Sequence, residues 1–240
     1  MSLTAALLEP LLSGPGAARP LITFYDDATG ERIELSAVTT ANWAAKAANL
    51  LRDECDLEPG GRLAVLLPAH WQTAAVLLAG WWCGAELVTD PADADWIACD
   101  AGGLDRALAA DPLGGVLALS LDAFGKGLPG LPTGVIDFAT EVRLHGDDFV
   151  PWSPVPPETP ALAGTIVADV LVTARTRAAE LGIGPTDRVL STLDWDTPAG
   201  LTDGLLAVLA AGASLVQVRH PDPAALTRRA STERTTRLLA

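Results

Sequence analysis

The sequence has few basic residues, and lysine is the scarcest of them. Acidic residues outnumber basic ones by 30 to 16, so the formal net charge is -14 at pH 7. Lys46 and Lys126 are its two lysines. A protein with this charge balance repels phosphate backbones and anionic lipid. We therefore expect neither a nucleic-acid partner nor a membrane partner.

Cysteine and long apolar runs are also in short supply. Cys55, Cys83 and Cys99 are widely spaced and form no C-x-x-C pair. This spacing argues against a disulfide framework or a structural zinc site and is typical of a reducing compartment. The apolar run AAVLLAGWWCGAELV is too short to span a bilayer, and the start MSLTAALLEPLLSG lacks the basic region of a signal peptide. We expect a cytoplasmic protein.

The sequence does contain a β-α-β alternation. LAVLLPA, at residues 63–69, is an unbroken apolar run typical of a strand covered on both faces. HWQTAAVLLAGWWCGAE follows as a helix that is apolar nearly all round. The pattern predicts an α/β fold with a mostly parallel β-sheet layered by helices. We expect residues 1–240 to form one α/β unit. It can also be divided into a first βαβ lobe, 37–183, and a partial second lobe, 1–36 with 184–240.

Individual elements can be placed within this pattern. Residues 3–12 predict a short helix, and LITFYD and ERIELS flank a Gly-containing turn that predicts a β-hairpin. Thr39 or Thr40 is expected to cap the next helix. After a proline-rich stretch, a long helix is predicted from about Ala161 to Leu181, ended by Gly182.

Two segments together resemble the adenylate-forming superfamily, the acyl-CoA synthetases and their AMP-binding relatives. They are LSAVTTANWAAKAANLLRDECDLEPGGRLAVLLPAHWQTAAVLLAGWWCGAELV and ADVLVTARTRAAELGIGPTDRVLSTLDWDTPAGLTDGLLAVLAAGASLVQVRHPDPAAL, which cover more than half of the chain. The resemblance implies the N-terminal subdomains of that fold. The sequence stops before the family's adenine-binding segment, its ribose-binding Asp and its mobile C-terminal lid domain, so the resemblance implies a truncated relative.

The family's phosphate loop and its lysine fall on residues 153–161. This window reads SPVPPETPA, and Ala161 stands where the lysine is expected. A phosphate loop needs glycines, so that backbone N–H groups can converge on oxyanions, and it needs a cation. Four prolines, no glycine and the acidic Glu158 offer neither. We predict no cofactor, with neither ATP nor AMP bound in the family's manner.

The turn DWDTPAG raises a second question about a site. Asp196 and Thr197 match positions where acyl-CoA-forming members often carry an aromatic-His pair, so that role does not carry over, whereas Gly200 matches a family glycine. Asp194 and Asp196 could form a metal or acid/base pair, or an N-cap and a solvated loop charge. We assign no catalytic residue and no metal ligand. The pocket candidates are Trp152, Thr159, Asp194, Trp195, Asp196, Thr197 and Gly200.

These residues favour a non-catalytic relative of the AMP-binding enzymes, acting in small-molecule binding or protein association. An incomplete sheet would leave apolar surface to be covered, so we expect a homo-oligomer or a protein partner. Two alternatives stay open. One is an acyl-activating, ligase-like enzyme of altered mechanism. The other is a subunit of a split acyl-CoA synthetase-like enzyme.

Overall fold

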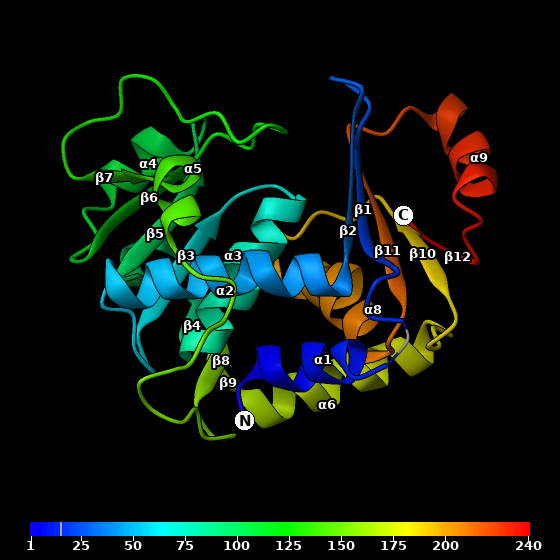
Figure 1. The fold of residues 1–240 in the computed structure, drawn as a ribbon, viewed down its shortest axis with the longest axis horizontal. Helices are drawn as coiled ribbons and strands as arrows, with labels where there is room; N and C mark the ends of the chain where they lie inside the picture. The colour runs from blue at the N-terminus through cyan, green and yellow to red at the C-terminus, as the bar shows by residue number, and fades with distance from the viewer. Residues whose placement is uncertain (15) are drawn as a thin grey trace. The chain divides into compact units, whose positions relative to one another are not determined.

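The computed structural model describes residues 1–14 and 16–240, which form two compact units. The first unit comprises Met1–Ala5, Ala41–Pro68 and Gln72–Val170. The second comprises Ala6–Thr40, Ala69–Trp71 and Leu171–Ala240. Each unit is built around one β-sheet, and Figure 1 labels the strands of both sheets. By residue range, several helices begin in one unit and end in the other.

The first unit contains a seven-stranded sheet in the order β7-β6-β5-β3-β4-β8-β9. Its strands are β3 (Arg62–Leu66), β4 (Glu86–Val88), β5 (Trp96–Asp100), β6 (Gly115–Leu119), β7 (Val135–Asp137), β8 (Pro160–Leu162) and β9 (Thr165–Ile166). All neighbouring pairs are parallel except β8 and β9, which form an antiparallel hairpin. Apolar strands at the centre of the sheet are expected when helices cover both faces, and Ile97 and Cys99 of β5 are fully buried.

Helices α2 (Ala37–Asp53) and α3 (Trp71–Cys83) lie largely within the first unit, with the shorter α4 (Leu104–Ala109) and α5 (Phe138–Glu141). The prediction that α3 is buried all round is confirmed, because every residue from 71 to 81 is buried. The predicted cap of α2 is wrong. The helix begins at Ala37, and the Ser36 hydroxyl accepts a hydrogen bond from the Thr39 N–H at 3.0 Å, the geometry of an N-cap.

The second unit contains a five-stranded sheet in the order β12-β10-β11-β1-β2. Its strands are β1 (Pro20–Asp26), β2 (Glu31–Ser36), β10 (Arg188–Ser191), β11 (Ser214–Arg219) and β12 (Arg237–Leu239). The predicted β1–β2 hairpin is confirmed, and the other neighbours are parallel. The mostly parallel α/β architecture expected from the sequence is thus present in both sheets.

The helices of the second unit are mostly short. They are α1 (Leu3–Leu12), α6 (Val167–Glu180), α7 (Pro198–Leu201), a π-helical turn at Thr202–Leu206, α8 (Ala207–Ala210) and α9 (Pro223–Thr232), with α1 and α6 starting in the first unit. None of the helices in the described part of the chain combines the length and apolar composition that a membrane span requires.

The predicted start of the long helix α6 is wrong. Pro160–Leu162 form strand β8, and the chain turns back at Ala163 and Gly164 into β9 before the helix begins. Ala163 has φ +46° and Gly164 has φ +82°, as a two-residue hairpin turn of the primed type requires. The helix therefore begins six residues later than expected.

Candidate functional site

Residues 153–161 are the segment in which the sequence resemblance leads us to expect the family's phosphate loop. Their backbone forms hydrogen bonds within the segment and with the first residues of α6. The Thr159 N–H donates to the Pro156 carbonyl at 3.1 Å. The Pro157 carbonyl accepts the Ala168 N–H and the Thr159 carbonyl accepts the Val167 N–H, both at 2.9 Å. Free N–H groups at a helix N-terminus are what attracts an anion. Here these two amides of α6 already have carbonyl partners.

Ala161, the position at which the sequence resemblance leads us to expect a lysine, lies in the core of the first unit. It belongs to β8, is 1% exposed, and its carbonyl accepts a hydrogen bond from Trp81 Nε1 at 2.9 Å. An ammonium group at this position would need a charged partner or water to be stable. The neighbouring Thr159 is half-buried and lies in the turn that leads into β8.

The DWDTPAG turn of the second unit is held together by its own polar groups. Thr197 is the N-cap of α7 and accepts a hydrogen bond from the Gly200 N–H at 3.1 Å. Asp194 accepts the N–H groups of Ala69 and Trp195, each at 2.9 Å. A Cβ at position 200 would lie 2.4 Å from the Asp194 carbonyl oxygen, so the turn requires glycine there.

The structure therefore gives the N-cap to Thr197, and Asp194 ties the turn to Ala69 instead. Asp196 is exposed to solvent. Across residues 1–14 and 16–240, no cluster of three or more His, Cys, Asp or Glu side chains could hold a metal ion.

Trp195 is packed into the second unit. Its side chain is 6% exposed, and a Cβ at Gly204 would lie 2.8 Å from its indole nitrogen. Gly204 belongs to the π-helical turn, and such turns are frequent at functional sites. Here the turn places a glycine where the indole needs room, which is a packing role.

A buried polar layer in the second unit has no counterpart among the predicted site residues. His70 is 1% exposed, its ring packs edge-on to Phe24 with centroids 4.3 Å apart, and its Nε2 lies 3.7 Å from Glu31 Oε1. Burial lowers the pKa of His70, and this effect outweighs the nearby Glu31 carboxylate, which raises it. Gln217, 1% exposed, donates to the Leu193 carbonyl at 2.9 Å.

A neutral buried imidazole beside a carboxylate is compatible with acid/base chemistry. Its buried position is equally that of a polar layer packed in a core. The sequence signal that could have pointed to it is the alternation of polar and apolar residues in β11, which places Gln217 on the same face as its neighbour Phe24 in β1.

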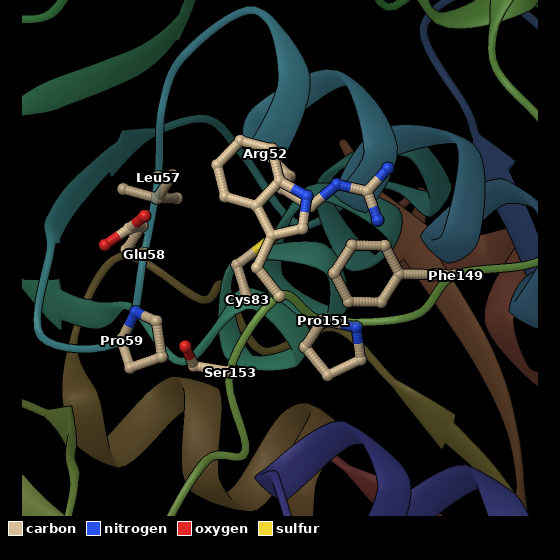
Figure 2. A pocket seen from close by; sticks show the side chains of 9 residues that line it. Arg52, Leu57, Glu58, Pro59, Cys83, Phe149, Pro151 and Ser153 are labelled. Carbon is tan, nitrogen blue, oxygen red and sulfur yellow. The ribbon is translucent and has the colours of Figure 1, made fainter.

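The first unit has a surface pocket at one end of α2. Its open volume is about 240 Å³, including the space that faces solvent. The pocket is lined by Arg52, Leu57, Glu58, Pro59, Cys83, Phe149, Pro151, Trp152 and Ser153. Figure 2 shows the Arg52 guanidinium beside the Phe149 ring, and Glu58 on the opposite side of the pocket. Trp152 is the one residue among the pocket candidates from the sequence that lines this pocket.

The guanidinium of Arg52 fixes the aromatic side of the pocket. Its carbon lies 5.1 Å from the centre of the Phe149 ring and 5.7 Å from that of Trp152, within the range of a cation–π contact. Arg52 also donates to Asp53 at 2.7 Å and to the Val150 carbonyl at 2.6 Å. Its hydrogen bond to Asp53 raises the pKa of Arg52, so the cation is permanent at any physiological pH.

The fold of the two sheets is that of the adenylate-forming enzymes. The chain matches an acyl-CoA synthetase from Brucella canis with TM-score 0.80 and 17% identity, covering 99% of this chain and 47% of that chain. It matches an acetoacetyl-CoA synthetase from Streptomyces lividans with TM-score 0.79 and 16% identity, covering 99% and 42%. A benzoate CoA ligase from Burkholderia xenovorans LB400 matches with TM-score 0.73 and 18% identity, covering 99% and 50%.

The chain thus spans about half the length of these solved structures, and the resemblance expected from the sequence is confirmed at the level of the fold. No family model matches the chain. A protein from Mycobacterium tuberculosis described as a TIGR03089 family protein is 54% identical over 246 residues, covering 99% of this chain and 98% of the relative. The chain belongs to the TIGR03089 family.

Proposed function

We propose that this protein is a non-catalytic member of the adenylate-forming fold that acts by binding, through protein association or a small molecule, and that it performs no ATP-dependent acyl activation. The observation that carries the proposal is the state of residues 153–161. The amides of Val167 and Ala168 are hydrogen-bonded to carbonyls of this segment. Ala161, where the resemblance implies a lysine, is buried, and its carbonyl accepts a hydrogen bond from Trp81.

The chemistry supports the same conclusion. Stabilising charge on a transferring nucleotidyl group is usually the largest contribution in such reactions, and it requires converging donors or cations. Lys46 is bound to the His145 carbonyl and Asp147. Lys126 lies in an exposed loop of the first unit. Neither residue lies in the segment that matches the phosphate loop.

The test is a pyrophosphate-release assay of the full chain with ATP, Mg²⁺, CoA and a panel of carboxylic acids. An acyl-CoA synthetase run in parallel supplies the positive control. We expect no release above the rate without enzyme, and no heat of ATP or AMP binding by calorimetry at millimolar nucleotide. Release that depends on the carboxylic acid would overturn the proposal and favour an enzyme of altered mechanism.

A further inference from the structure

The pocket at Trp152 continues into a segment that is strapped along one side of helix α2. The strap is defined here as residues 145–152. Lys46 donates to the His145 carbonyl at 2.7 Å, and Asn49 donates to the carbonyls of Gly146 at 3.1 Å and Asp148 at 2.9 Å. With Arg52 on the Val150 carbonyl, four backbone acceptors of an irregular segment are fixed by one helix. The strap is rigid without being part of the sheet.

This rigid segment holds apolar side chains out in solvent. Val150 is 73% exposed and Trp152 is 59% exposed, whereas Phe149, which also belongs to the strap, is buried. The Arg52 guanidinium contacts the Trp152 ring and so restricts its rotation. Exposed, pre-ordered tryptophan is a typical anchor of a binding surface, because it buries a large area at a small cost in conformational entropy.

Acidic residues are frequent in the strap and in the chain that follows α2, and one of them, Glu58, lines the pocket with Trp152. Asp53 and Asp147, with side chains 38% and 54% exposed, are paired with Arg52 and Lys46. Glu54, Glu58 and Asp148 are exposed, and within the described residues none of the three forms an ion pair. Five carboxylates therefore face two cations, and the surplus is negative.

The size of the pocket decides between a small molecule and a peptide. Small-molecule sites usually enclose about 300–1,000 Å³, whereas the enclosed part of this pocket is about 10 Å³. A cavity of about 10 Å³ holds no more than a single water molecule, so a partner would lie against the surface around the pocket. A nucleic acid is excluded as the occupant by the negative surplus around the pocket and over the whole chain.

We propose that the surface formed by Val150, Trp152 and the adjoining pocket binds a basic peptide segment of a partner protein, one that carries Lys or Arg next to an apolar residue. The apolar residue packs against the exposed Val150 and Trp152 side chains at the rim of the pocket, and the basic side chain places its charge near Glu58. This site deepens the association role proposed above, but it uses only the surface of the first unit.

The experiment is a selection of phage-displayed random dodecapeptides against the immobilised full chain. We expect the enriched peptides to be net positive, with an apolar residue adjacent to Lys or Arg. One enriched peptide, labelled with fluorescein, is then titrated by anisotropy. Trp152→Ala should weaken binding at least tenfold. A Glu54→Gln, Glu58→Gln, Asp148→Asn variant should weaken it severalfold and flatten its dependence on salt.

The matched control is Phe124→Ala, which removes another aromatic side chain of the same unit that is 93% exposed. It should leave peptide affinity unchanged. The proposal is overturned if no peptide is enriched, if the enriched peptides are neutral or acidic, or if Trp152→Ala binds as tightly as Phe124→Ala. Dimerisation in sedimentation velocity that is lost in Trp152→Ala would overturn it in favour of a second copy. Pyrophosphate release in the assay above would overturn the non-catalytic function alone, and would leave the peptide result standing.

Discussion

The two units use their charged residues in opposite ways. In the second unit, Glu233 is 8% exposed and accepts hydrogen bonds from Tyr25 and Arg188, each at 2.5 Å, and from Arg32 at 3.0 Å. In the first unit, the basic side chains of α2 bind backbone carbonyls of the strap and pair with Asp53 and Asp147. Glu54, Glu58 and Asp148 are exposed and form no ion pair within the described residues. Charges that satisfy one another stabilise a fold, whereas a one-sided surplus on a rigid surface is available to a partner.

The pKa of Glu233 is shifted by its burial and its ion pairs. Burial alone opposes ionisation, but the hydrogen bonds from Tyr25, Arg188 and Arg32 outweigh it and lower the pKa to about 2. Near the strap, the hydrogen bond from Arg52 lowers the pKa of Asp53, an exposed group whose contribution to stability is small. The following experiments test whether the charged residues around Glu233 stabilise the second unit, and whether those near the strap contribute little to the stability of the first.

The largest effect is expected from placing a charge in the core of the first unit. Ala161→Lys puts an ammonium group where the family has its lysine, but the site is 1% exposed. We expect the free energy of unfolding to fall by roughly 4 kcal/mol, since buried lysines lose 3–5 pKa units. Urea denaturation measures the loss, and the pyrophosphate assay should remain at background.

Thr165→Lys is the control for this substitution, because Thr165 lies on the neighbouring strand β9 and is exposed. It should change stability by less than about 0.5 kcal/mol. An Ala161→Lys protein as stable as wild type, with acid-dependent pyrophosphate release, would mean that this segment can open to hold a nucleotide.

The next effect concerns the paired charges of the second unit. Glu233→Gln leaves Arg188, whose side chain is 17% exposed, without its closest carboxylate. We expect a loss of about 3 kcal/mol at pH 7 by urea denaturation, the usual result of removing one partner from a buried pair. Glu180→Gln, which removes a carboxylate 55% exposed and paired with Arg177, should cost about 0.5 kcal/mol at most.

The same pair of variants gives a pH dependence with a definite sign. Because the pKa of Glu233 is lowered on folding, its contribution is present above the unfolded value near 4.5 and is lost as the pH falls towards 2. The difference between wild type and Glu233→Gln should therefore shrink over this interval. A difference that stays constant from pH 7 to pH 2.5 would show that the carboxylate's charge is not what stabilises the unit.

Much of this architecture could be predicted from the sequence, because it follows from patterns of a few adjacent residues. The apolar run of α3, the hairpin of β1 and β2, and Gly200 in its tight turn each follow from a few adjacent residues. The resemblance to the adenylate-forming fold rests on the order of such segments. The β8–β9 hairpin was missed because its turn, Ala163 and Gly164, reads as helix in an apolar context.

The candidate site was harder to predict because its partners are far apart and carry no side-chain signature. Asn49 binds carbonyls 97 and 99 residues away, and any residue type provides a carbonyl. The network at Glu233 likewise joins three strands and a helix end, with partners 45, 201 and 208 residues away. Trp152 was chosen from its type alone; the structure adds the pocket, and its binding role stays a prediction.

A smaller effect is expected from loosening the strap. Asn49→Ala removes two hydrogen bonds to backbone carbonyls, each contributing about 1 kcal/mol. We expect a loss of about 2 kcal/mol and faster hydrogen exchange of amides in residues 145–150. Asn42→Ala, on the same helix, is the control, since the Asn42 side chain makes no hydrogen bond within the described residues. Equal exchange in both variants would show that Asn49 does not order the strap.

The smallest perturbation uses the thiols, which report on one unit only. Cys55, Cys83 and Cys99 all lie in the first unit and are buried, and burial raises the pKa to about 12 for Cys55 and Cys83 and to about 11 for Cys99. At pH 8 we expect them to react with Ellman's reagent at least about a hundredfold more slowly than free cysteine. In Asn49→Ala the rate should rise with local opening, and in Glu180→Gln it should not. A rate that rises equally in both would mean that the thiols follow global unfolding, and that the first unit has no separate stability for the strap to control.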